Sequence, residues 1–214
     1  MISPNDIQVT KVDLTLFATV LVVGNVVERQ LFNKQLFNEA WKNTAVSVLL
    51  GVALHGLLTN KVSAMINARV KGTVGVEQSV YDLVKFGTIF AVQRAGTFYL
   101  QGRPVGLEIY TENWLKDNGS VIAGYAIFNM LLRDMVPNVS AVYQPMINDF
   151  VKVSLGFLSS KYVMNGFVTQ THLLELSAIL AGFAVFHLST KSLVVQKDRF
   201  TSLGGISVYN KRRA

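Results

Sequence analysis

Apolar residues gather in several stretches along the chain, and polar or charged segments separate these stretches. The longest stretch that is almost uncharged runs over residues 171–190 and contains one charge, Glu175. About 20 apolar residues suffice for a helix to cross the hydrocarbon core of a bilayer. The pattern therefore predicts a membrane-spanning helix over 171–190, in which Ala178 and Gly182 form a small-residue face for helix packing.

Two weaker apolar stretches predict helices nearer to the N-terminus. Residues 12–27 contain a single charge, and they reach the length of a span only if flanking residues join the helix; a helix lying at the membrane interface is the alternative. Residues 44–58 carry Gly51 and Gly56, which permit the close approach of a second helix. Between them, residues 28–43 predict an amphipathic helix at the membrane surface. A connecting helix packed on protein is the alternative for this segment.

Three further helices are predicted in the second half of the chain, over residues 79–100, 119–135 and 139–163, before an Asn-Gly turn. Residues 59–78 are polar and basic, and we interpret them as a connection. Residues 101–118 contain two glycines and a proline, which break regular structure, so they predict a second long connection.

Composition places these helices in a membrane. Half of the 214 residues are hydrophobic and 15% are charged, against a usual charged share of about 25% in soluble domains. The mean hydropathy is +0.37. We therefore expect an all-α protein, a multi-pass helical membrane bundle of about four to six helices in one domain over 1–214. The alternative is an apolar soluble subunit buried in an oligomer.

Positive charge is concentrated at the end of the chain. The net charge is +7, and six of the 20 lysines and arginines follow the last apolar stretch in a basic C-terminal tail, 191–214. Such clusters beside a span favour an anionic lipid or acidic protein surface. Tryptophan beside lysine also suits the headgroup region. The candidate anchors are Trp41, Lys42, Trp114, Lys191, Lys197, Arg199, Lys211, Arg212 and Arg213.

Three polar side chains fall inside predicted helices: His55, Asp82 and Lys85. Asp82 and Lys85 are three residues apart, so they lie on one helix face and can pair. Intramembrane charges can mark a transport or proton path. We favour instead a protein-facing or interfacial helix with a solvated charged stripe. For His55 we favour a bond to a backbone carbonyl or a position at the interface.

No catalytic motif is present in the sequence, and cysteine is absent. We expect no enzyme activity and no cofactor. If the protein were an enzyme, the last helix would offer His172, Glu175 and His187, although a simple pair between His172 and Glu175 is the favoured interpretation. Basic residues do not alternate with aromatic residues along any segment, so specific nucleic-acid binding is not expected.

In its short apolar segments, its lack of cysteine and its basic segments, the chain resembles the small multi-pass membrane proteins beneath the capsids of large icosahedral DNA viruses. The resemblance implies a minor capsid protein that links the inner membrane of a virion to the shell. We therefore predict a structural subunit that joins a lipid bilayer to other protein subunits through its loops and tail. A small channel or transporter using Asp82, Lys85 and His55 is the alternative, and charges that face the bundle interior would support it.

Overall fold

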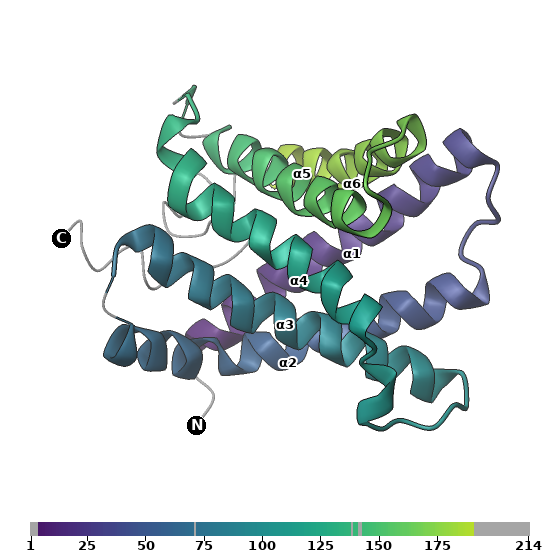
Figure 1. The fold of residues 1–214 in the computed structure, drawn as a ribbon, viewed down its shortest axis with the longest axis horizontal. Helices are drawn as coiled ribbons and strands as arrows, with labels where there is room; N and C mark the ends of the chain where they lie inside the picture. The colour runs from purple at the N-terminus through teal and green to yellow at the C-terminus, as the bar shows by residue number, and fades with distance from the viewer. Residues whose placement is uncertain (1–3, 71, 138, 141–142, 191–214) are drawn as a thin grey trace.

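The computed structural model describes residues 4–70, 72–137, 139–140 and 143–190, and this part of the chain is helical without a strand. The elements are α1 (Pro4–Phe32), α2 (Glu39–Arg69), α3 (Val74–Leu100), η1 (Leu107–Ile109), α4 (Glu112–Ile127), η2 (Phe128–Leu132), η3 (Arg133–Met135), α5 (Gln144–Asn165) and α6 (Gln170–Ser189) (Figure 1). The all-α prediction is confirmed, with six α-helices in the described ranges. The basic tail, including Lys191, Lys197, Arg199, Lys211, Arg212 and Arg213, lies outside the described residues.

Local signals fix several helix ends. The side chain of Asn38 accepts a hydrogen bond from the backbone N–H of Trp41 and begins α2. Thr169 caps α6 in the same way. Gly166 has φ of 78° and ends α5, which confirms the turn predicted at Asn165–Gly166.

The segment 28–43 is not an amphipathic helix, and the prediction for it is wrong. Its first residues extend α1 to Phe32, and the next six form a turn before α2. The backbone N–H of Phe37 donates to the side chain of Asn25 at 3.0 Å, which ties the turn back onto α1. Because the flanks join, α1 has 29 residues and reaches the length of a span.

The two predicted connections are also shorter than expected. Helix α2 continues to Arg69, so residues 70–73 alone link it to α3. Polarity was misleading here because Thr59 and Ser63 are buried in the bundle. Within 101–118, the side chain of Thr111 caps the start of α4. Residues 119–135 end in the π-helical turn η2 and the 3-10 turn η3.

The six helices form a closed ring. Each α-helix packs against its neighbours in chain order, and α6 packs against α1 to complete the circle. The start of α1, the α2–α3 link and the α4–α5 link lie on the left of Figure 1. The α1–α2, α3–α4 and α5–α6 links lie at the other end of the ring.

Three helices are long and apolar enough to cross a membrane: residues 6–32 of α1, all of α2 and all of α6. Large apolar side chains are exposed on the outside of the molecule, among them Val22, Leu50, Leu54, Leu83, Met130, Leu131, Val185 and Leu188. The prediction of a helical bundle with several candidate membrane spans is therefore confirmed, and the outer surface is consistent with membrane association.

Candidate functional site

Ionisable side chains from four helices meet inside the ring. The central network consists of Asp13 in α1, Asp82 and Lys85 in α3, Asp149 and Lys152 in α5, and His187 in α6. All six are buried, and Asp82 and Lys85 have no exposed surface. Burial of charge is costly unless the charges are paired and hydrogen-bonded, so the partners of these groups decide how they can act.

Two ion pairs cross the ring between helices that are not neighbours. Lys85 Nζ lies 2.7 Å from Asp13 Oδ2, which joins α3 to α1 across α2. Lys152 Nζ pairs with Asp82 Oδ2, which joins α5 to α3 across α4. The predicted pair between Asp82 and Lys85 is therefore replaced by partners on other helices. The expected solvated stripe is wrong, because both side chains face the interior.

Further hydrogen bonds to the carboxylates come from the same helix and from neighbouring helices. Asn129, in the π-helical turn η2, donates from Nδ2 to Asp82 Oδ2 at 2.6 Å, and Gln78 donates to Asp82 Oδ1 at 3.2 Å. His187 Nε2 lies 2.8 Å from Asp149 Oδ2. Lys152 Nζ also lies 5.4 Å from the centre of the Tyr125 ring, close enough for a cation–π contact.

The network follows an internal repeat of three helix pairs, α1–α2, α3–α4 and α5–α6, here called units 1, 2 and 3. The first helix of each unit carries an aspartate at one position, followed by a lysine three residues later in two of them: Asp13–Leu16, Asp82–Lys85 and Asp149–Lys152. The lysines of units 2 and 3 each bind the aspartate of the preceding unit. Leu16 occupies the lysine position in unit 1 and is fully buried.

The second helix of each unit repeats a glycine, a bulky residue, an alanine and an aliphatic residue. The aligned segments are 51–57, 124–130 and 182–188. Five residues after the glycine they carry Gly56, Asn129 and His187. Asn129 and His187 each bind the aspartate of their own unit, so these two hydrogen bonds are equivalent.

The repeated glycines permit the same close helix contact three times. A Cβ atom at Gly51, Gly124 or Gly182 would lie 2.9 Å, 2.7 Å or 2.5 Å from the Cα of Ile89, Gly156 or Val20, respectively. Each contacted residue lies seven positions after the aspartate of its helix. The predicted helix contacts at Gly51 and Gly182 are confirmed, and the repeat of sequence is also a repeat of packing.

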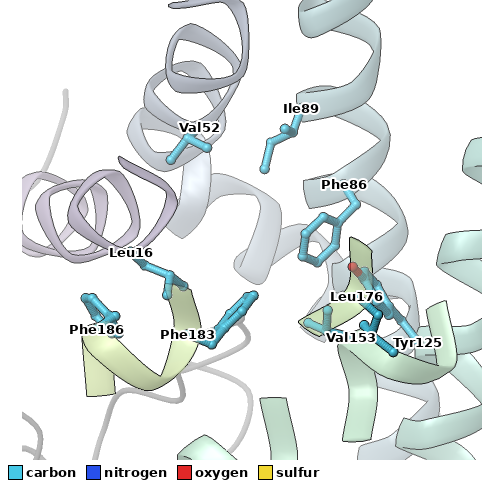
Figure 2. Close-up of a cluster of buried hydrophobic side chains, with 9 residues drawn as sticks. All are labelled: Leu16, Val52, Phe86, Ile89, Tyr125, Val153, Leu176, Phe183 and Phe186. Carbon is cyan, nitrogen blue, oxygen red and sulfur yellow. The ribbon is translucent and has the colours of Figure 1, made fainter. Parts of the chain in front are cut away.

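An apolar layer covers the network on one side. It is formed by Leu16, Val52, Phe86, Ile89, Tyr125, Val153, Leu176, Phe183 and Phe186 (Figure 2). Beyond this layer α1, α3 and α5 contribute few buried residues: those of α3 stop at Ile89 and those of α5 at Ser160, although Ser47 of α2 and Ala178 of α6 are still buried. Along α1, Asn25 is the one buried residue after Leu16.

His55 differs from its expected state. It is 1% exposed, and neither ring nitrogen has a hydrogen-bond partner among the described residues. Its ring meets Tyr81 edge-on with centroids 5.4 Å apart. It is equivalent in the repeat to Phe128 and Phe186, so an aromatic ring occupies this position in all three units. The predicted carbonyl bond or interfacial position is wrong.

The other candidate residues lie away from the network. Trp41 and Trp114 are half-buried near the starts of α2 and α4, and Lys42 forms an exposed pair with Glu39 at 3.3 Å. The proposed pair of His172 and Glu175 is wrong. His172 Nδ1 accepts from the Thr169 backbone N–H, and Glu175 pairs with Lys161 at 3.2 Å. In the described ranges no three histidine, aspartate or glutamate side chains are grouped to hold a metal ion.

Asp13, Asn129, Asp149, Lys152 and His187 were not recognised as members of one interior network from the sequence. The signal that reveals them is the repeated Asp-x-x-Lys in α3 and α5, together with the repeated glycine segments. The architecture defines an all-α protein with three candidate membrane spans, a closed ring of six helices and a central charge network. Comparisons with protein-family models, curated proteins and solved structures found no match.

Proposed function

We propose that the protein is a membrane transport protein, in which the central network closes one end of the ring of six helices. The observation that carries the proposal is the presence of two ion pairs, Lys85–Asp13 and Lys152–Asp82, that cross the interior between alternate helices. Charges inside a membrane bundle are expensive and commonly mark ion, proton or substrate pathways.

The burial of the charges also explains how α3 and α5 can cross a bilayer. Neither helix is apolar enough by composition. A charge at the centre of a membrane helix costs about 2.5–3.5 kcal/mol on insertion scales. Here Asp82, Lys85, Asp149 and Lys152 point inward, so lipid would meet apolar residues such as Leu83 instead. At 27 and 22 residues, α3 and α5 have sufficient length.

The uneven burial along the helices favours transport over a purely structural role, in which the protein only links a membrane to other subunits. Near the network every helix of the ring contributes buried residues, whereas the part of α3 from Phe90 to Phe98 is partly exposed on all its faces. Gly96 packs closely on Ser47 of α2, but no side chain from Phe90 to Phe98 is fully buried. We infer an interior that is accessible from the Gln93 end and closed at Lys85.

Thiol labelling in sealed vesicles tests this proposal without knowledge of the substrate. The natural chain has no cysteine, so single cysteines can be placed at Gln93, Gln78 and Leu83 of α3. We expect a membrane-impermeant maleimide to label Gln93→Cys from one side of the bilayer. Gln78→Cys, on the other side of Lys85, should be protected from that side. Leu83→Cys, whose side chain is 53% exposed on the outer surface, is the control for a thiol in lipid.

Opening the network should change the sidedness of labelling. In a Lys85→Met background we expect Gln93→Cys to react from both sides. The charge-reversed pair Asp13→Lys with Lys85→Asp should restore one-sided labelling, which also controls for loss of fold. Labelling of Gln93→Cys as slow as that of Leu83→Cys, or unchanged sidedness in a folded Lys85→Met protein, would contradict the transport proposal.

The role as a structural subunit of an assembly stays a prediction. It depends on the basic tail, which lies outside the described residues, and on the exposed apolar surface, which lipid alone could cover. Recovery of the protein from purified particles at a fixed stoichiometry would favour this role, including the virion location implied by the resemblance.

A further inference from the structure

We propose that Asp149 and His187 form a proton-binding site that replaces the third lysine–aspartate pair of the network, and that the bound proton closes this side of the ring. The inference rests on the proposed transport function only for its coupling step. The site itself follows from the repeat: two units supply a lysine to the preceding aspartate, and the unit that should serve Asp149 supplies Leu16.

Charge balance within the six groups of the network points to a proton as the ligand. The network contains the carboxylates of Asp13, Asp82 and Asp149, but the ammonium groups of Lys85 and Lys152 alone. A buried carboxylate without a compensating charge is strongly disfavoured. One proton on the His187 imidazole makes it a cation and balances the six groups. Its Nε2 then donates to Asp149 Oδ2 across the observed 2.8 Å.

The surroundings of the site fit this assignment. Helix α6 packs against α1 and α5. Asp149 belongs to α5, where Lys152 follows three residues later. The charges of Lys152 and Lys85 both act on Asp149. From α1, Leu16 packs with Phe183 and Phe186 of α6 in the apolar layer, where a charge would stand in the other two units (Figure 2). Asp13 is engaged by Lys85.

Comparison with unit 2 distinguishes a proton-binding role of His187 from a purely structural hydrogen bond. The residue equivalent to His187 is Asn129, which also binds an aspartate but cannot take up a proton. In unit 2 a lysine supplies the positive charge to Asp82. For Asp149 the serving lysine is missing, because unit 1 carries Leu16 at that position, and the amide is replaced by an imidazole, which can take up a proton. Loss of the proton would leave Asp149 uncompensated and would weaken this side of the ring.

The test follows the protonation of His187 by ¹⁵N NMR in the detergent-solubilised full chain. His172, at the start of the same helix, is the internal reference. We expect His187 to titrate in the wild type. Leu16→Lys should lower the midpoint by about one pH unit or more, because an ammonium group close to the imidazole opposes its protonation. Leu14→Lys, two residues away on another face of the same helix, should leave the midpoint unchanged.

A second variant does not depend on whether Leu16→Lys folds. Asp149→Asn removes the carboxylate and should lower the His187 midpoint by about one unit or more. A His187 that stays neutral throughout, or a midpoint that neither variant moves, would overturn the proton site. These measurements involve no transport, so they are independent of the thiol labelling. If His187 titrates as expected while the thiol labelling contradicts transport, the proton site stands and only its coupling to transport is excluded.

Discussion

Breaking the Lys85–Asp13 pair should destabilise the folded protein strongly. In Lys85→Met the methionine fills much of the volume of the lysine stem, but Asp13 is left as a buried carboxylate without its partner at 2.7 Å. Removal of one member of a buried pair costs about 3–5 kcal/mol. Removal of both, in Asp13→Leu with Lys85→Met, should be close to neutral or stabilising, since apolar groups of similar volume replace buried pairs without loss.

The free energy of unfolding in mixed detergent micelles, followed by helical circular dichroism, measures both effects. The exposed pair Lys42–Glu39 provides the matched control, and Lys42→Met should change stability by less than about 1 kcal/mol. A double-mutant cycle on Asp13 and Lys85 should give a coupling of several kcal/mol. If Lys85→Met costs no more than Lys42→Met, the interior pair is not a major interaction of the folded state.

Two further predictions concern the aromatic position of His55 and the glycine contacts. His55→Phe should raise stability by about 1–3 kcal/mol in the same unfolding assay, because it removes a buried imidazole whose nitrogens lack partners and restores the residue type of Phe128 and Phe186; a loss of stability would indicate that the imidazole binds water or another group. Gly182→Ala should destabilise by about 1–3 kcal/mol, since its Cβ would lie 2.5 Å from Val20 Cα. Gly87→Ala, whose Cβ meets no atom within 4 Å, should stabilise by up to about 1 kcal/mol; equal effects of the two changes would contradict the packing argument.

The sequence predicted the helices well where apolar length alone decides the structure. The span at 171–190 became α6 with nearly the same ends, because one continuous apolar run needs no tertiary information. The sequence prediction is wrong at 28–43 and 59–78, where polar residues were expected to lie outside the helical bundle. Asn25 closes a turn and Thr59 is buried, so in this bundle polarity does not mark the ends of helices.

The central network could not be predicted from local sequence patterns, for a related physical reason. The spacing of Asp82 and Lys85 satisfies the rule for pairing along one helix, and that rule describes an isolated helix. Inside the ring a partner on another helix lies closer and satisfies the carboxylate better. The true partners are about 70 positions apart in the sequence, and only the comparison of the three units relates them.

The repeat changes how the single polar residues should be interpreted. His55 stood out in the sequence because it is isolated, yet it occupies an aromatic position that two phenylalanines fill in the other units. His187 is equally isolated in the sequence, yet it occupies the place where the repeat lacks a charge. Leu16 carries no signal by itself, because an apolar residue in an apolar helix is ordinary. In a molecule built from three similar units, function is therefore best sought where one unit departs from the others. In the charge network that departure is the set Leu16, Asp149 and His187.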